Sequence, residues 1–131
     1  MNKNKKNIIL IVEDEVIISK TYAEELRDEG FIVFTAGNGK DGLKIALLKK
    51  PDLILLDILM PVMDGLTMMD KLRKKNIYGK NVPIVLLSNL SSSEEKIMKT
   101  VTNTKNEPTS YFVKSDWDLD DVVAKIKQLL S

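Results

Sequence analysis

Five short apolar runs alternate along this chain with stretches in which apolar residues recur every three or four positions. The runs cover residues 8–12, 31–36, 52–56, 82–87 and 111–113. Turn-forming or charged residues bound them, and continuous apolar runs of this length are typical of strands buried on both faces. The pattern therefore predicts five buried strands.

The stretches between the runs predict helices, since their apolar residues fall on one helical face. Gly30 ends the first helix and Pro51 the second, while the fourth has the weakest pattern. The faces are Ile18, Tyr22 and Leu26; Leu43, Ala46 and Leu47; Leu66, Met69 and Leu72; Ile97, Met98 and Val101; and, within 118–130, Leu119, Val122, Val123, Ile126, Leu129 and Leu130.

Strand and helix thus alternate five times, which is typical of a parallel sheet because parallel strands need crossover connections. We expect an α/β fold, a doubly wound (βα)5 sandwich whose five-stranded parallel sheet has the order 2-1-3-4-5 and carries helices on both faces. With 131 residues, the chain is expected to form one domain over 1–131. Residues 1–6 are expected to be a flexible basic arm.

Composition excludes several kinds of chemistry. The chain has no Cys and no His, so disulfides, thiolate or imidazole metal sites and histidine acid–base catalysis are absent. Its net charge of +1 gives no global field toward nucleic acid or membrane, and we expect neither to be contacted directly. The apolar run at 8–12 is too short for a signal peptide or a membrane span, so a cytoplasmic location is expected.

Polar residues stand at the carboxyl ends of the predicted strands. Glu13 and Asp14 follow the first strand, Asp57 the third, Ser88 the fourth and Lys114 the fifth. Ligand sites of doubly wound sheets lie beyond these ends. In the order 2-1-3-4-5 the four strands are contiguous, and the second, which delivers nothing reactive, is at the edge.

These residue types complement one another. Clustered carboxylates repel one another, and a hard divalent cation relieves the repulsion; oxygen ligands without His or Cys favour Mg²⁺. Lys114 supplies a cation for Asp57 or for a phosphoryl group, and Ser88 supplies a hydroxyl donor. Together they are the parts needed to move a phosphoryl group onto an Asp.

The chain resembles a response-regulator receiver domain of two-component signalling, of the chemotaxis-regulator kind. Glu13-Asp14 is similar to the family's acidic pair, and Asp57 to Gly65 reads D-I-L-M-P-V-M-D-G, similar to its D-x-x-M-P-x-x-D-G stretch. Ser88 stands at the hydroxyl position, and Tyr111 stands three residues before Lys114. The resemblance covers essentially the whole chain.

The resemblance implies a role for each of these residues. Asp57 is the phosphoacceptor, and Glu13, Asp14, Asp57 and the main-chain carbonyl of Leu59 surround Mg²⁺. Ser88 and Lys114 contact the phosphoryl group, and Tyr111 repacks. The repacking alters the face made by the helix near 97–101, the strand 111–113 and the helix 118–130.

The sequence departs from the family pattern at two single residues and in one segment. Ser115 stands where Pro is common after the lysine, and Asn89 where Ala often follows the hydroxyl residue. A long polar segment, 103–110, replaces the usual Gly-Ala. Leu59 and Leu90 stand two residues after Asp57 and Ser88, positions that influence phosphoryl lifetime in the family.

Structural explanations compete for single residues. Asp57 alone could cap a turn, and Glu13 and Asp14 could be helix N-terminal charges. Asp64 is expected to cap the third helix. The basic residues of 71–75 are expected to form a solvated helix end, and Trp117 and the methionines to serve packing.

The predicted function is a phosphorylation switch rather than an enzyme. A histidine kinase or phosphotransfer protein would donate the phosphoryl group, and a downstream protein would read the altered face. The alternatives are an unphosphorylated binding module and a small Mg²⁺-dependent hydrolase with an Asp nucleophile, which Leu59 disfavours because such enzymes usually carry a second Asp there. An FMN protein is excluded by the acids after the first strand. The chain could act alone or within a longer regulator or hybrid kinase, as a monomer or a phosphorylation-dependent dimer.

Overall fold

A five-stranded parallel sheet forms the centre of the molecule. The structure is a computed structural model that describes residues 6–88, 110–113 and 118–131. The strands are β1 (Ile8–Val12), β2 (Ile32–Ala36), β3 (Leu53–Asp57), β4 (Ile84–Ser88) and β5 (Ser110–Val113). Their order in the sheet is β2-β1-β3-β4-β5, so the predicted α/β fold and strand order are confirmed.

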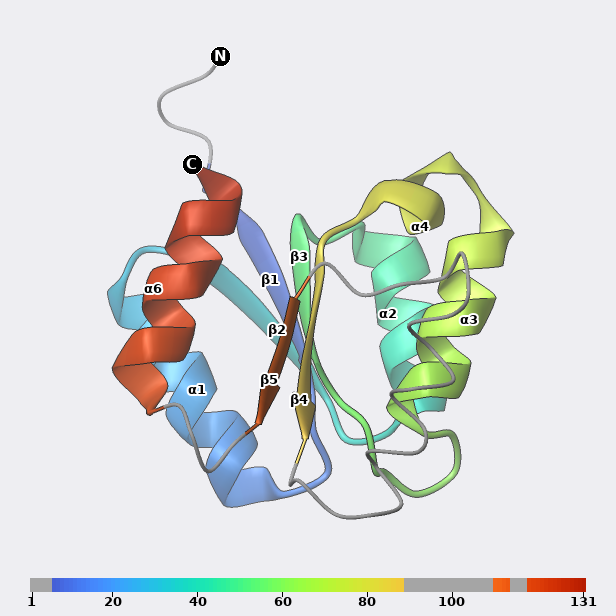
Figure 1. Cartoon of the computed structure of the whole chain (residues 1–131), viewed down its shortest axis with the longest axis horizontal. Coiled ribbons are helices and arrows are strands. Elements are labelled where there is room, and N and C mark those ends of the chain that lie inside the picture. The colour runs from blue at the N-terminus through green and yellow to red at the C-terminus, as the bar shows by residue number, and fades with distance from the viewer. Residues whose placement is uncertain (1–5, 89–109, 114–117) are drawn as a thin grey trace.

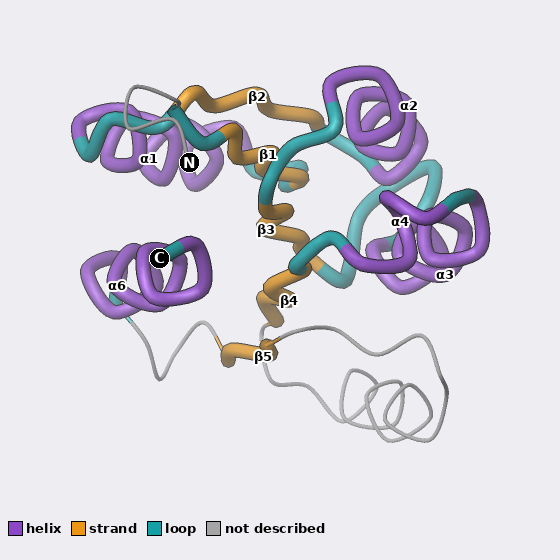
Figure 2. The backbone as a smooth tube through the Cα atoms, turned by 90° about the horizontal axis from the view of Figure 1, so that it is seen from above, coloured by secondary structure: helices purple, strands orange, loops and turns teal. Residues whose placement is uncertain are grey.

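Helices cover both faces of the sheet (Figures 1 and 2). One layer contains α1 (Val16–Asp28) and α6 (Leu119–Leu130), and the other contains α2 (Gly39–Lys49), α3 (Gly65–Lys75) and α4 (Ile77–Asn81). An ion pair between Lys127 of α6 and Glu29 after α1 links the two helices of the first layer. The helix predicted around 97–101 lies outside the described residues.

Two apolar clusters, one on each face of the sheet, explain why the strands read as unbroken apolar runs. In β1, Ile9 and Ile11 pack toward α1 and α6, whereas Leu10 and Val12 pack toward α2 and α3. Successive side chains of a strand point to opposite faces, and here both faces are dry. All five residues of β3 are buried, which places Asp57 at the end of the most enclosed strand.

The short helix α4 was not predicted from the sequence. It contains only five residues, too few to show a repeating pattern of apolar positions, and its middle residue is Gly79. Asn76 caps it by accepting a hydrogen bond from the Gly79 N–H at 2.7 Å. A Cβ on Gly79 would lie 1.9 Å from the carbonyl oxygen of Leu72, so only glycine allows α4 to pack this closely on α3.

Arg73 corrects the expectation that the basic residues of 71–75 are all solvated. Its guanidinium is half-buried, and Nη1 donates to the carbonyl oxygens of Gly79 at 3.0 Å and Val82 at 2.6 Å. Burial lowers the pKa of this guanidinium from its usual range. Arg73 therefore ties the end of α4 to α3, whereas Lys71, Lys74 and Lys75 are exposed as expected.

Within the part of the chain that the structure describes, none of the helices combines the length and the apolar character that crossing a membrane requires.

Candidate functional site

The carboxyl ends of the central strands meet at one edge of the sheet. Val12 of β1 pairs with Leu56 of β3, so Glu13 and Asp57 are the next residues of two neighbouring strands. Asp57 itself pairs with Leu87 of β4, and the following residue, Ser88, pairs with Val113 of β5. The register therefore brings the acids of β1 and β3 together beside the backbone end of β4.

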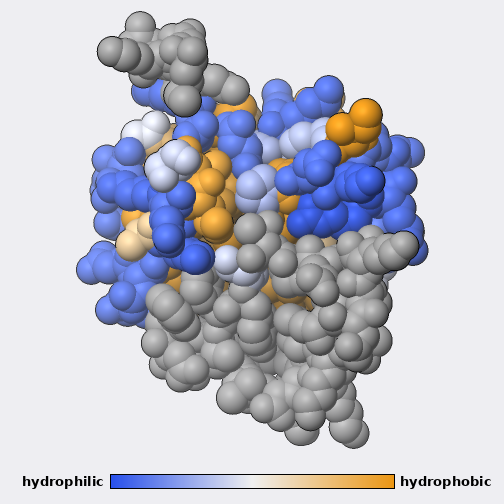
Figure 3. All heavy atoms as spheres, turned by 45° about the horizontal axis from the view of Figure 1, so that its top comes forward, coloured by the Kyte–Doolittle hydropathy of each residue, from blue (hydrophilic) through white to orange (hydrophobic). Residues whose placement is uncertain are grey.

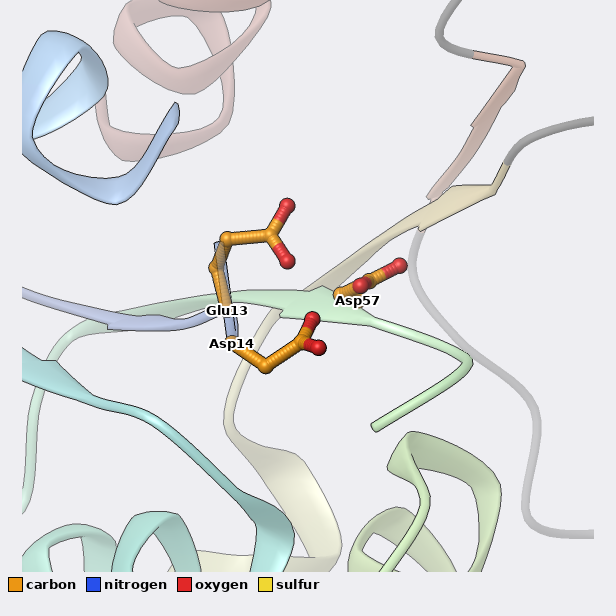
Figure 4. A group of neighbouring side chains, drawn as sticks. All are labelled: Glu13, Asp14 and Asp57. Atoms are coloured by element: carbon orange, nitrogen blue, oxygen red, sulfur yellow. The ribbon is translucent and has the colours of Figure 1, made fainter. Parts of the chain in front are cut away.

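Three carboxylates gather at this edge. One oxygen each of Glu13, Asp14 and Asp57 lies within 4.8 Å of the others, and Figure 4 shows the side chains of Asp14 and Asp57 converging. Glu13 and Asp57 are only 4% and 5% exposed, while Asp14 lies at the open rim. Burying two carboxylates is costly unless a cation or hydrogen bonds compensate their charge, so the cluster is suited to a cation.

The electrostatics of the cluster follow from this crowding. Withdrawal from water and the neighbouring Glu13 carboxyl both raise the pKa of Asp14 above its usual value. Asp14 is exposed as a residue, yet its carboxylate points into the site toward Asp57 (Figure 4). The Glu13 carboxylate accepts a hydrogen bond from the Glu15 N–H at 3.4 Å, which orients it at the start of α1.

The donor set fits Mg²⁺. In octahedral coordination at about 2.0–2.1 Å, oxygens on opposite sides of the ion are about 4.2 Å apart. Adjacent oxygens of the same shell are about 2.9 Å apart, so the three carboxylate oxygens, which lie within 4.8 Å of one another, would draw closer together around a bound ion. Since no His or Cys occurs in the chain, the ligands are hard oxygens, which matches Mg²⁺ and not zinc or copper.

The loop from Asp57 to α3 is held at its start by the close approach of α3. Gly65 N–H donates to the carbonyl of Ile58 at 2.8 Å, and Ile58 N–H donates to Leu87 of β4 at 3.2 Å. A Cβ on Gly65 would lie 2.1 Å from the Asp57 carbonyl oxygen, closer than any real contact. Glycine is therefore required where α3 begins, directly behind the Asp57 main chain.

The middle of this loop contains a tight turn. Met63 N–H donates to the Pro61 carbonyl at 2.7 Å around Val62, whose φ is 69°. This geometry is that of a γ-turn with positive φ, which is strained for a β-branched residue. The Met63 carbonyl accepts a hydrogen bond from Gly39 N–H of α2 at 2.9 Å, so α2 supports the strained segment.

Asp64 ends the loop as the N-cap of α3. Its carboxylate accepts hydrogen bonds from the Thr67 N–H at 2.7 Å and the Thr67 hydroxyl at 3.1 Å. The expected capping role of Asp64 is thus confirmed. The side chain of Leu59 is 49% exposed beside the site.

A polar cleft of about 360 Å³ opens next to the acids, between α1 and the end of β2. Its lining includes Glu13, Asp14, Lys20 and Thr35. The cleft gives solvent and small molecules access to the carboxylates from the α1 side.

The structure describes some of the other predicted site residues only in part. Ser88 ends β4 and Tyr111 lies in β5 opposite Leu86, so their backbones are placed at the expected strands. Lys114, Ser115 and Trp117 lie outside the described residues, as do Asn89, Leu90 and the 103–109 part of the polar connector. The predicted roles of Ser88, Lys114 and Tyr111, to contact the phosphoryl group and to switch the output face, remain predictions.

Sequence reasoning missed the residues that shape the backbone of the site. Gly39 and Gly65 do so by close approach and Val62 by its turn. The D-G pair at 64–65 was visible as a turn signal, but only the fold reveals what the glycine contacts. Val62 gave no signal, since β-branched residues disfavour positive φ.

A sequence model of the response regulator receiver domain matches residues 9–127. The chain therefore belongs to the receiver domain family of two-component signalling, which consists of regulatory domains and not of classical enzymes. The match covers nearly all of the chain, and the family resemblance of the motifs is confirmed.

Individual relatives agree with this assignment. TcrX of Mycobacterium tuberculosis, a probable transcriptional regulatory protein, is 29% identical over 122 residues, which are 93% of this chain and 49% of TcrX. The transcriptional regulatory protein PdtaR of the same species is 32% identical over 124 residues, or 94% of this chain and 56% of PdtaR. The chain thus spans about half the length of the curated relatives it matches.

Solved structures show the same fold. The chemotaxis response regulator CheY4 of Vibrio cholerae superposes with a TM-score of 0.80 at 26% identity, covering 95% of this chain and 98% of CheY4. The BeF3-activated receiver domain of Klebsiella pneumoniae RstA gives a TM-score of 0.77 at 28% identity, covering 93% and 97%.

Proposed function

We propose that this domain is a switch that accepts a phosphoryl group on Asp57 with the help of Mg²⁺. The observation that carries the proposal is the burial of Asp57 at the end of β3, within 4.8 Å of two further carboxylates. Asp57 is itself the last residue of β3, the central strand of the sheet, whereas Glu13 and Asp14 follow the end of β1. Structural change at Asp57 can therefore reach both halves of the sheet.

The acids would divide the work. Glu13 and Asp14 would hold Mg²⁺ with Asp57 and the main-chain carbonyl of Leu59, and the bound ion would neutralise charge on the transferred group. An Asp57 carboxylate oxygen forms a bond to phosphorus as the bond from phosphorus to the donor's leaving group breaks. The cluster is already close-packed, so catalysis consists of alignment and charge neutralisation.

The donor would be a histidine kinase or phosphotransfer protein, because this chain has no His of its own. Ser88 and Lys114 would bind the transferred phosphoryl group, and Tyr111 would repack. The added charge would thereby alter the surface that a downstream protein reads. BeF3 has the shape and charge of a phosphoryl group, and the similar RstA domain is described as activated by it.

Intact mass spectrometry tests the proposal. Incubation with acetyl phosphate and Mg²⁺ should add one alkali-labile phosphoryl group, and omission of Mg²⁺ should prevent it. Asp57→Asn should abolish the adduct. Asp64→Asn is the matched control, since it makes the same change in the same loop at the α3 cap, and it should leave the adduct in place.

The alternatives give different results. A receiver-fold binding module gives no adduct in the wild-type chain. An Asp-nucleophile hydrolase releases phosphate steadily and leaves no lasting adduct. Either result contradicts the switch.

A further inference from the structure

Charge is distributed unequally between the two helical layers. The layer of α2, α3 and α4 with their flanking residues is strongly basic, whereas the α1 and α6 layer is acidic. The basic layer carries Lys40, Lys44, Lys49, Lys50, Lys71, Arg73, Lys74, Lys75 and Lys80 against Asp41, Asp64 and Asp70. The acidic layer carries Glu24, Glu25, Asp28, Glu29, Asp118, Asp120 and Asp121 against Lys20, Arg27, Lys125 and Lys127.

A groove of about 430 Å³ runs between α2 and α3 in the basic layer. On the α2 side its lining consists of Leu43 and Leu47, one helical turn apart, which are called the floor below. On the α3 side it consists of Asp70 and of Lys71, Lys74 and Lys75, which are called the rim. The leucines are only partly buried. Figure 3 shows hydrophilic residues around one apolar patch on the side of α3 and α4, and Ile77 of α4 is itself exposed. The groove thus combines an apolar floor with a cationic rim.

Two of the three lysines that line the groove form no ion pair with the described residues of the chain. Lys74 forms an exposed ion pair with Asp70 at 3.1 Å, but Lys71 and Lys75 make no ion pair with the described residues. Cations near a helix C-terminus stabilise the helix dipole, and this accounts for Lys75. It does not account for Lys40, which lies in the first turn of α2, where a positive charge is unfavourable.

The residues that line the groove indicate which class of ligand it would bind. A phosphate backbone or a lipid headgroup would need the lysines but would gain nothing from a leucine floor. An amphipathic helix offers apolar residues at i and i+4, matching the one-turn spacing of Leu43 and Leu47. Acidic flanks on such a helix would complement Lys71 and Lys75 in the lining of the groove. Opposite charge across an interface speeds association and sets specificity.

We propose that the α2–α3 groove is a docking site for an acidic amphipathic helix of a partner protein. The helix places its apolar stripe on Leu43 and Leu47 and its carboxylates beside the flanking lysines. This surface lies in a different layer from α6, the helix of the proposed output face that the structure describes. Docking does not require phosphorylation of Asp57.

Fluorescence anisotropy with a labelled synthetic helix tests the proposal. The probe carries Leu at i, i+4 and i+7 and Glu at the flanking positions, and a scrambled peptide of the same composition lacks the apolar stripe. At physiological salt the first peptide should bind saturably, and the scrambled peptide should bind roughly tenfold more weakly or worse. Asp57→Asn should bind like the wild type, which separates this test from that of the switch.

Two double variants separate the groove from general electrostatics. Lys71→Glu with Lys75→Glu should weaken binding roughly tenfold or more. Lys6→Glu with Lys80→Glu changes the net charge equally at exposed positions outside the groove, and it should change binding less than roughly threefold because salt screens distant charges. Leu47→Asn should weaken binding without altering net charge. Thermal unfolding of every variant confirms that it is folded.

The proposal is overturned if the peptide does not bind, or if the scrambled peptide binds equally well. It is also overturned if both double variants weaken binding alike, since net charge then explains the result. Duplex DNA or phosphatidylglycerol vesicles binding more tightly than the peptide, without effect of Leu47→Asn, would assign the basic layer to a phosphate surface instead.

Discussion

Gly65→Ala probes how tightly α3 packs against the end of β3, the strand that ends at Asp57. The new Cβ would lie 2.1 Å from the Asp57 carbonyl oxygen and 3.0 Å from its carbon. Real Cβ atoms are essentially never found closer than 3.0 Å to another heavy atom, so backbone must move by roughly 1 Å. Both partners are buried, and neither is the end of a flexible side chain that could swing aside.

Two opposing effects set the magnitude. Forcing extra volume into a packed site costs about 1–3 kcal/mol, with larger losses where only backbone can yield. Alanine is the better helix former by at most about 1 kcal/mol, and this gain is smaller at the first helical position, where Gly65 stands. We expect a net loss of about 1–3 kcal/mol, which lowers the Tm of a domain of this size by roughly 4–11 °C.

Urea unfolding followed by circular dichroism measures the loss, with an unchanged m-value as the sign that the unfolded state is unaffected. Gly37→Ala is the matched control, because a Cβ there meets nothing within 4 Å. It should be neutral or stabilise by about 0.4–1 kcal/mol through the unfolded state. Equal stability of the two variants would refute the contact argument.

Gly65→Ala should also slow phosphorylation of Asp57. A shift of roughly 1 Å in the main chain that carries a reacting group can cost up to about a hundredfold in rate. The rate of adduct formation from acetyl phosphate, measured well below the Tm of the variant, checks this. A destabilised variant with a wild-type rate would show that the Asp57 carboxylate is positioned independently of α3.

Three further predictions concern other parts of the molecule. Arg73→Met should destabilise by about 1.5–3 kcal/mol in urea, because buried carbonyls lose a charged donor, whereas Lys74→Met should cost less than about 1 kcal/mol, since its ion pair is exposed. Burial raises the pKa of Tyr78 above the ordinary value of about 10. As the pH rises, the unfolded state therefore loses the Tyr78 proton before the folded state does. The contribution of Tyr78 to the free energy of unfolding is complete below a pH of about 10 and decreases above it. Tyr78→Phe should remove this contribution to the loss of stability at high pH, measured by urea unfolding at a series of pH values. Mg²⁺ at about 100 times its Kd should stabilise by about 2.7 kcal/mol, and Asp14→Asn should abolish most of this gain in thermal melts.

The fold was predictable because its determinants are local or follow from topology. Strands buried on both faces read as unbroken apolar runs, and strand–helix alternation implies a parallel sheet. The proximity of Glu13, Asp14 and Asp57 was predictable from this topology, since these acids stand at the carboxyl ends of β1 and β3, which are neighbours in the sheet. What the sequence could not supply are distances between segments remote in the chain.

The helix α4 illustrates this limit. Its five residues carry no period, and Gly79 argues against a helix. It forms because Arg73 binds its carbonyls and because Gly79 fits against Leu72. Both are tertiary contacts that override local propensity. The role of Arg73 was hidden for the same reason, since it stands within a lysine-rich run.

The loop after Asp57 combines fixed ends with an exposed middle, and this arrangement suits a switch. Gly65 and Ile58 anchor its ends to each other, and Gly39 holds Met63, whereas Val62 is 77% exposed in a strained turn. On the proposed function, a charge added at Asp57 acts on a segment that is held in place, because Ile58 is bonded to Gly65 of α3 and Met63 to Gly39 of α2. The added charge would therefore cause small shifts of packed groups, and elements with two stable arrangements amplify such shifts. If Asp57 accepts a phosphoryl group as proposed, the close approach of Gly65 to Asp57 matters for signalling as well as for stability, since it holds the Asp57 main chain in place while the charge changes.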